Sequence, residues 1–403
     1  IDTKSFNRLY AVDSSLTITG INADYRLRLR PEAQYEFVMS LINELSNKGA
    51  LNISVNTAGF SLNSFAAKYN LKKEVLNHLI SDLASNKGKS IIDAGNSLPE
   101  NVHIAVNLLN SALGNTAMYR TDSAVNTFVN NSSLQDLELL VQNMNSGNVQ
   151  AVIHLDCNPV YHLSNDLGYR NALKKVGFIF TLSERESETT ASSDFILPIN
   201  HNFESWGDAK VRTGSISLQQ PVIAPINDTR QKEAILLTWI SGSADTYNEK
   251  LYHDFLMNNW EASIYPTLNS KLDFKRFWLG ALHDGIVLVN ETVPTPTLSA
   301  NAAGLLSGGV SNANGYTVVI KENYALADGR FAHNGWLQEL PHPISKITWD
   351  NYAAVSEKTC KELGLKNNDL IEITIGDRRL SIPVFMQAGS ADEVITIESG
   401  YGK

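Results

Sequence analysis

The sequence predicts an α/β protein with a smaller β-rich region at its C-terminal end. Short apolar runs that stop at a turn or an acidic residue alternate with segments of helical periodicity over roughly the first 240 residues. Strands that alternate with helices favour a mainly parallel sheet covered on both faces. A stretch rich in Thr, Pro, Ser, Asn, Ala and Gly at residues 290–315 then separates this part from a set of alternating strands.

The first region shows two predicted strands and three predicted helices. Residues 8–13 are a short apolar run ending in Asp13, as a parallel strand ending at a loop would be. Residues 31–45 carry a helical apolar stripe with Pro31 near its start. We also expect helices at 71–83 and at 102–113, the latter closed by Gly114, and a strand followed by a glycine turn at 89–95.

The same alternation continues in the second region. The pattern predicts helices at 134–144 and 171–176, and strands at 149–155, 177–182 and 194–199. His154 falls within the first of these strands, where a histidine satisfied in the core is more common than a metal ligand. A mainly helical stretch begins at Thr229.

The C-terminal region reads as a small β-barrel with one helix. Strands of alternating character are predicted at residues 316–320, 370–375, 379–385 and 394–397. Ser356 is placed to cap a helix at 356–363, because its hydroxyl can accept from the first free amides of the helix.

Length, charge and cysteine content exclude several functional classes. A chain of 403 residues predicts two to four domains. The net charge of −9 argues against a nucleic-acid partner, and no apolar run approaches the ~20 residues that span a bilayer. We therefore expect any membrane attachment to come through a partner or a segment outside this sequence. The sequence starts at Ile1 and stops at Lys403, and both ends look like cuts inside a longer protein.

The two cysteines, Cys157 and Cys360, lie far apart and neither has a neighbouring cysteine. Iron–sulfur clusters require several closely spaced thiolates, so no cluster is expected in this sequence itself. We expect two isolated buried thiols, with a disulfide between them as the open alternative.

The segment at residues 188–220 carries the most specific signal. Glu188-Thr189, Ala191, Asp194 and Leu197-Pro198 are followed by Glu204, Gly207 and Gly214-Ser215. This order resembles the molybdopterin-oxidoreductase superfamily, in which a sheet strand gives way to a loop over the pterin cofactor. Further matches lie at 12–15, 19–24 and 29–31, and at the turn Asp156-Cys157-Asn158-Pro159.

The chain departs from the superfamily pattern at positions that hold the cofactor. The acid expected to pair with guanine is Gln34, the preceding glycine is Glu32, and arginines are replaced by Ser15 and Ser215. The resemblance thus implies a cofactor site retained only in outline, with Gln34, Glu204, Gly207 and Ser215 as vestigial pterin-site positions. We name no catalytic residue. His201, Glu204 and Asp208 lack a third nitrogen or sulfur ligand, so no metal site is expected there.

A third block narrows the resemblance. Residues 328–343 and Thr348-Trp349-Asp350 resemble the iron–sulfur/molybdopterin-like subunit (B subunit) of alternative complex III, a quinol-oxidising bacterial respiratory complex. This implies a scaffold without cofactor, iron–sulfur clusters in an adjoining C-terminal domain, and partners that include a multihaem cytochrome c and integral membrane quinol-binding subunits. The implied location is the periplasmic face of the inner membrane. Phe331, Trp336 and Trp349 would serve as interface anchors or pack the barrel onto the α/β domains.

The resemblance also assigns the domains. Residues 1–115 form a Rossmann-type α/β domain (domain III-like), 116–240 a second (domain II-like), 241–315 a helical extension and linker, and 316–403 a double-psi β-barrel (domain IV-like). The alternative function is part of an active molybdenum bis-pterin oxidoreductase of the polysulfide- or thiosulfate-reductase kind, whose metal ligand would lie upstream of Ile1. A generic nucleotide-binding protein is a third interpretation, weakened by the missing phosphate loop.

Overall fold

The computed structural model describes residues 6–120, 131–291, 296–306, 309–310 and 314–401. The chain divides into two compact units, the first made of Ile1–Tyr119 with Pro296–Lys403 and the second of Arg120–Thr295. The prolines and glycines that predict a linker lie partly outside the described residues, namely at Pro294 and Gly308. The predicted domain boundaries stay a prediction.

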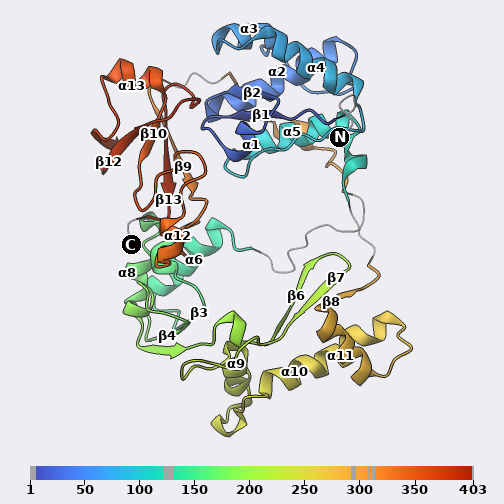
Figure 1. Ribbon diagram of the computed structural model, residues 1–403, viewed down its shortest axis with the longest axis vertical. Helices are drawn as coiled ribbons and strands as arrows, with labels where there is room; N and C mark the ends of the chain where they lie inside the picture. Colours follow the sequence, from blue (N-terminus) through green and yellow to red (C-terminus); the bar gives the residue numbers. More distant parts are fainter. Residues whose placement is uncertain (1–5, 121–130, 292–295, 307–308, 311–313, 402–403) are drawn as a thin grey trace. The chain divides into compact units, whose positions relative to one another are not determined.

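The first unit contains two groups of elements (Figure 1). Its N-terminal group is β1 (Tyr10–Asp13), α1 (Ile18–Ile21), β2 (Tyr25–Arg28), α2 (Gln34–Asn47), α3 (Leu62–Lys68), α4 (Lys73–Ser85) and α5 (Glu100–Ala112). Its C-terminal group is β9 (Thr317–Glu322), α12 (Gly335–Glu339), β10 (Ala353–Val355), α13 (Glu357–Leu363), β11 (Leu370–Ile375), β12 (Arg378–Met386) and β13 (Val394–Ser399).

The N-terminal group is built around α2, whose apolar stripe is buried as its periodicity predicts. Phe37, Leu41 and Ile42 of α2 pack with α3, α4 and α5 in one core. The strands β1 and β2 are parallel, with Tyr10 opposite Tyr25. Gly114, in a left-handed conformation at φ 73°, follows the end of α5 as expected.

The strand predicted at 89–95 is wrong. Ile92 donates its backbone N–H to the side chain of Asn110 at 3.1 Å, and its carbonyl accepts from the same side chain at 2.7 Å. An amide side chain on α5 therefore takes the bonds that a neighbouring strand would have made, and the segment stays irregular.

The C-terminal group forms a mixed sheet in the order β11-β12-β10-β13-β9. Its four predicted strands correspond to β9, β11, β12 and β13, and their alternation places Ile382, Val384 and Ile395 in one core with Cys360 of α13. Ser356 caps α13, its hydroxyl accepting from the N–H of Thr359 at 3.2 Å, as predicted. The short strand β10 carries no alternation and was not anticipated.

The second unit contains a parallel sheet and an antiparallel sheet (Figure 1). Its helices are α6 (Leu134–Asn145), α7 (Pro159–His162), α8 (Tyr169–Leu173), α9 (Lys232–Ser241), α10 (Leu251–Asn259) and α11 (Phe274–Asp284). Its strands are β3 (Ala151–Leu155), β4 (Phe178–Ser183), β5 (Phe195–Pro198), β6 (Gly207–Arg212), β7 (Ser215–Gln219) and β8 (Ile286–Leu288). The antiparallel strands β6, β7 and β8 pack beside α10 and α11 around the buried Trp260.

Within the described residues the parallel sheet β3-β4-β5 carries helices on both faces, but one face is covered more closely than the other. Helices α6 and α8 bury Val152 and Ile179 on that face. On the other face α9 buries Leu182 with Ile235 and places Trp239 beside Phe180. Ile153, Phe178 and Phe195 of this face remain 50%, 56% and 51% exposed. The prediction of parallel strands is confirmed, and the prediction that both faces are covered holds in part, because α9 covers only the part of the second face around Leu182.

His154 is a core histidine, as predicted. It is buried, with Nδ1 2.9 Å from the hydroxyl of Thr181 and Nε2 2.7 Å from that of Tyr169. Cys360 is buried, but Cys157 is exposed, so the expectation of two buried thiols is wrong for Cys157. Cys157 follows Asp156, whose backbone φ of 50° turns the chain out of β3 into an exposed bend. Both thiols are free.

Candidate functional site

Glu204 lies in a 3₁₀ turn, Asn202–Glu204, between β5 and β6. Its Oε2 accepts from the N–H of His201 and its Oε1 from the N–H of Ile226, each at 2.9 Å. These two backbone bonds, first that of Ile226 and then that of His201, lower the pKa of Glu204 below its ordinary value. Glu204 is therefore an ionised group that ties two loops together.

Gly207 and Ser215 lie in the β6–β7 hairpin. Gly207 is paired with Gln219, and Ser215 with Arg212 beside the turn at Gly214. Ser215 is 1% exposed, and its hydroxyl has no hydrogen-bond partner among the described atoms. A side chain as long as arginine has no room at this position unless the hairpin moves.

Gln34 belongs to the other compact unit. It starts α2, is half-buried, and follows the 3₁₀ turn Pro31–Ala33. Of the four predicted positions, Glu204, Gly207 and Ser215 thus lie in one loop-and-hairpin region, and Gln34 lies in a separate unit.

The charged groups around Gln34 are paired with one another. Arg30 forms an ion pair of 2.5 Å with Glu32 and another with Glu393, and donates to Thr317 at 2.9 Å. Thr317 in turn donates to Glu32 at 2.7 Å. These contacts join the start of α2 to β9 and pair the charges there with one another, although Glu32 Oε2 itself is buried without a hydrogen-bond partner among the described atoms.

The charged groups at the ends of β1 and β2 are also paired with one another. Asp13 and Arg26 form an ion pair of 2.6 Å, and Arg26 also donates to the carbonyl of Gly389 at 2.7 Å. The N–H of Ala391 donates to the carbonyl of Ser14 at 2.7 Å. A Cβ on Gly20 would lie 2.6 Å from the Asp13 carboxylate, so the chain packs tightly here. A nucleotide needs an open approach to the strand end, and the close packing of Gly20 against Asp13 and Arg26 does not provide one.

The three residues weighed as a metal triad each have another partner. His201 Nδ1 accepts from the N–H of Phe203 at 3.1 Å, and Asp208 accepts from the indole N–H of Trp260 at 2.8 Å. Both carboxylate oxygens of Glu204 accept backbone bonds. No group of three metal-ligating side chains occurs within the described ranges.

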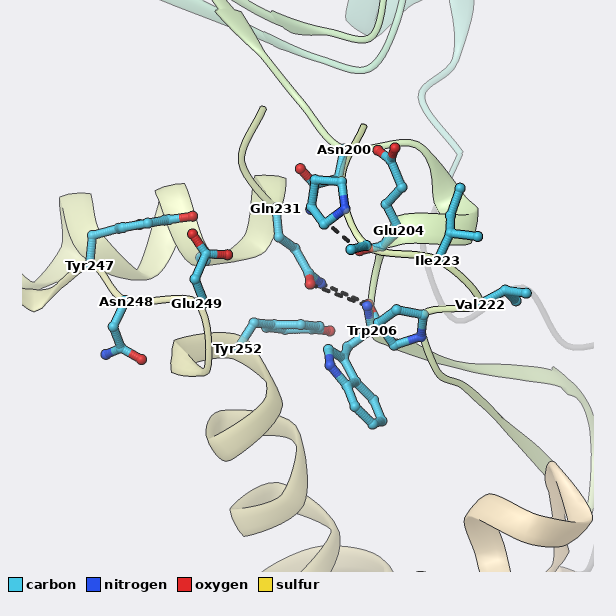
Figure 2. A pocket seen from close by; sticks show the side chains of 14 residues that line it. Asn200, Glu204, Trp206, Val222, Ile223, Gln231, Tyr247, Asn248, Glu249 and Tyr252 are labelled. Carbon is cyan, nitrogen blue, oxygen red and sulfur yellow. Dashed lines mark hydrogen bonds between the residues drawn. The ribbon is translucent and has the colours of Figure 1, made fainter. Parts of the chain in front are cut away.

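A cavity of about 360 Å³ opens beside Glu204, within the second unit (Figure 2). Gln231 forms its back wall, donating to the carbonyl of Trp206 at 2.7 Å and accepting from its N–H at 3.2 Å. Two loops and the start of α10 supply other side chains of the cavity wall. They include Val222, Ile223, Tyr247, Glu249 and Tyr252.

No sequence feature singles out the tyrosines and Glu249 of this pocket. They lie more than 40 residues after Glu204, follow no motif spacing, and come from a stretch predicted only as helical. Pairs of tyrosines near an acidic residue are common on protein surfaces, so no sequence signal of this kind could have found the pocket.

The pocket chemistry suits recognition of positive groups and hydrogen-bond donors. Burial, then the charges of Glu233 and Asp208, raises the pKa of Tyr252 to about 12. Burial, followed by the charge of Glu249, also raises the pKa of Tyr247. Both phenols therefore stay protonated and neutral near pH 7, and the pocket's charge comes from its carboxylates.

No family model matches the sequence. A curated relative is the menaquinone reductase, molybdopterin-binding-like subunit, of Nitratidesulfovibrio vulgaris, 26% identical over 241 residues, which are 53% of this chain and 35% of the relative. A solved structure with a similar fold is acetylene hydratase from Pelobacter acetylenicus, with a TM-score of 0.69 at 13% identity over 98% of this chain and 67% of that one. The fold of this chain is thus similar to that of acetylene hydratase. The matched part spans about a third of the curated relative's length.

The structure agrees with the predicted fold at the level of mixed α/β units with several sheets. None of the helices in the described ranges is long and apolar enough to cross a membrane.

Proposed function

We propose that this chain is part of a subunit of a quinone-linked respiratory electron-transfer complex, in which it acts as a molybdopterin-oxidoreductase-like scaffold without its own cofactor. The observation that carries the proposal is the similarity to a protein named as the molybdopterin-binding-like subunit of a menaquinone reductase. The paired charges around Gln34 and the buried Ser215 support the loss of cofactor, because neither position offers a contact to a nucleotide or a pterin.

The finer proposal is the B subunit of alternative complex III, which oxidises quinol. In that assignment residues 316–403 are a double-psi β-barrel, iron–sulfur clusters lie in an adjoining domain, and the complex faces the periplasm beside a multihaem cytochrome c and membrane subunits that bind quinol. The residues that support it are those of the block at 328–343, with Thr348, Trp349 and Asp350.

The partly covered face of the parallel sheet supports a role inside a larger assembly. Parallel sheets are normally covered on both faces. Here the open sheet face, defined as the exposed residues Ile153, Leu155, Phe178 and Phe195 beside the part that α9 covers, leaves apolar surface in contact with water. Phe195 stacks on Phe180 at 5.0 Å between ring centres, which extends the surface across β4 and β5. Apolar surfaces of this kind mark contact sites.

A second apolar surface lies in the C-terminal group. Trp336 of α12 is 86% exposed, and Phe331 and Trp349 are also exposed. Trp349 has a positive φ of 65°, an unusual backbone for a bulky residue. Exposed tryptophans often provide most of the binding energy at interfaces, so this surface supports contact with another subunit.

Metal and pterin analysis of the intact subunit, purified in its native complex, tests the scaffold role. We expect less than one-tenth of a molybdenum or tungsten atom per subunit and no guanine-nucleotide pterin. Stoichiometric metal together with that pterin would overturn the scaffold role and favour the active molybdenum oxidoreductase instead.

Variants on the open sheet face test the assembly role. Phe178→Ser and Phe195→Ser remove apolar surface at positions that are already half-exposed, so the isolated chain should still fold. We expect a severalfold lower yield of intact complex, with quinol oxidation per assembled complex unchanged. The matched variant Leu134→Ser changes an exposed apolar residue at the start of α6 and should leave the yield unaltered. Equal yields for all three variants would contradict the proposal.

A further inference from the structure

Three oxygen-bearing side chains of the pocket beside Glu204 lack a hydrogen-bond partner among the described residues. They are Tyr247, Glu249 and Tyr252, which line one side of the cavity. Figure 2 shows them across the pocket from Glu204, Val222 and Ile223. The neighbouring amides, by contrast, are engaged: Gln231 bonds to the backbone of Trp206, and Asn200 accepts from the hydroxyl of Thr229 at 2.7 Å. The pocket therefore holds acceptors that the chain itself leaves unused.

The charge around these acceptors is negative. Glu204 and Glu249 line the cavity, and Glu233 lies close enough to accept from Gln231 at 3.0 Å. Arg230 is a cation close to Tyr247 and Glu249, and it is ion-paired with Asp228 at 2.5 Å. Its charge is thus compensated, and the lining carboxylates keep a net attraction for a positive ligand.

Tyr247 already binds a cation in this structure. The guanidinium of Arg230 lies 5.6 Å from the centre of its ring. Cations are attracted to the faces of aromatic rings at this distance. The guanidinium of Arg230 therefore occupies the face of the Tyr247 ring. A second cation has to bind on the side of the pocket that carries Glu249 and the hydroxyls of Tyr247 and Tyr252.

The opposite rim is apolar. Val222 is 76% exposed, Ile223 is 43% exposed, and both belong to the segment Pro221–Pro225 that lines the cavity. Ile226, just after it, is 77% exposed. A ligand that fits this pocket therefore needs an aliphatic stem, which contacts the apolar rim, and a terminal positive charge, which lies beside Glu249. Lysine has this form, and its ammonium offers three N–H donors.

We propose that this pocket binds a lysine side chain of a partner protein, with the ammonium on Glu249 and the hydroxyls of Tyr247 and Tyr252. The alkyl stem lies along Val222 and Ile223, and the residues flanking the lysine rest on the exposed apolar rim. The site stands apart from the respiratory role, because it uses only groups of the pocket itself.

Titrations of the full chain with small probes, followed by nuclear magnetic resonance, test the site. The first probe is Nα-acetyl-lysine N-methylamide, and the second is the norleucine analogue, which has the same stem without the charge. We expect the lysine probe to bind in the millimolar range and the norleucine probe to bind about tenfold more weakly or not at all. Equal affinity for the two probes would overturn the proposal.

Matched variants place the binding at this pocket. Glu249→Gln should weaken the lysine probe by about tenfold, and Tyr252→Phe by a smaller factor. Both variants should fold, since neither group makes a hydrogen bond in the described structure. Glu261→Gln, an exposed acid on the turn after α10, makes the same charge change outside the pocket and should leave the affinity unaltered. Loss of binding in Glu261→Gln to the same degree as in Glu249→Gln would show nonspecific attraction and overturn the site.

A third arm separates a protein side chain from a free amine. n-Butylamine carries the ammonium and the stem but no peptide flanks for the rim. We expect n-butylamine to bind severalfold more weakly than the lysine probe. In Val222→Ser the affinity of the lysine probe should fall toward that of n-butylamine, because the apolar rim that contacts the peptide flanks is reduced. Binding of n-butylamine as tight as that of the lysine probe would overturn the assignment of a partner protein as the source of the ligand.

Discussion

His342 donates its Nε2 hydrogen to Glu398 across 2.9 Å in the interior of the C-terminal sheet. The ring has no choice of tautomer, because Nδ1 accepts from the N–H groups of Ile344 and Ser345 at 3.2 and 3.1 Å. Lys321 lies 3.1 Å from the same carboxylate, and Asn323 donates to its other oxygen. Glu398 is thus a buried carboxylate that holds β9, β13 and the loop of His342 together.

We expect Glu398→Gln to lower the free energy of unfolding at pH 7 by about 3 kcal/mol, because it leaves the donors around it without a charged acceptor. Burial raises the pKa of Glu398, but the hydrogen bond from His342 and the charge of Lys321 outweigh it, and the net pKa lies below its ordinary value. The stabilisation is therefore present above the unfolded pKa of about 4.3 and is lost as the pH falls through the lower folded pKa.

Urea denaturation at pH 7 and at several values below pH 4.3 measures this effect. The difference between wild type and Glu398→Gln should shrink as the pH falls. Glu372→Gln, on an exposed acid of β11 that lies 3.6 Å from Arg379, should change the stability by less than about 1 kcal/mol. A wild-type advantage over Glu398→Gln that stays constant with pH would contradict the electrostatic account.

Gly20→Ala should destabilise the first unit by about 1–3 kcal/mol. The added Cβ would lie 2.6 Å from Asp13 Oδ2 and 2.9 Å from Arg26 Nε, and those two side chains are locked in an ion pair. Calorimetry of the variant beside Gly304→Ala measures the effect, since a Cβ on Gly304 meets nothing within 4 Å. Equal melting temperatures for both variants would show that the Asp13–Arg26 pair is not held tightly.

Ser215→Ala should leave the stability unchanged or raise it by a few tenths of a kcal/mol. The hydroxyl is buried without a partner among the described atoms, so removing it removes a desolvation cost and breaks no bond. Ser215→Arg, which restores the superfamily residue, should instead destabilise the hairpin by overpacking. Denaturation curves for the two variants measure whether each change raises or lowers the free energy of unfolding. A Ser215→Arg protein as stable as wild type would mean that the hairpin still has room for a cofactor contact.

One thiol per native chain should react with a disulfide reagent, and two after denaturation. Cys157 is exposed and Cys360 is buried. Partial burial raises the pKa of the Cys157 thiol, so its reaction near neutral pH should be slower than that of a free thiol. Cys157→Ser should abolish the native reaction and Cys360→Ser should not; native labelling of both cysteines would place Cys360 outside the core.

Elements governed by local rules were predictable. The stripe of α2, the cap of Ser356 on α13 and the alternation of β11, β12 and β13 all follow from spacing within one segment. The strand β2 was missed because Arg26 and Arg28 give it no apolar alternation. These arginines are polar for a tertiary reason: they donate to the carbonyls of Gly389 and Ser390, more than 360 residues away.

The sequence by itself determined the superfamily pattern at residues 188–220 and the positions where it departs, because motif residues are read one by one along the chain. Only the tertiary structure decided what those positions do: Glu204 binds two backbone amides, Ser215 is buried, and Gln34 sits beside charges that neutralise each other. The tertiary structure alone also brings Tyr247, Glu249 and Tyr252 together in one pocket. The physical reason is that pairing of charges, burial and the enclosure of a cavity depend on segments far apart in the chain, and no local pattern encodes their meeting.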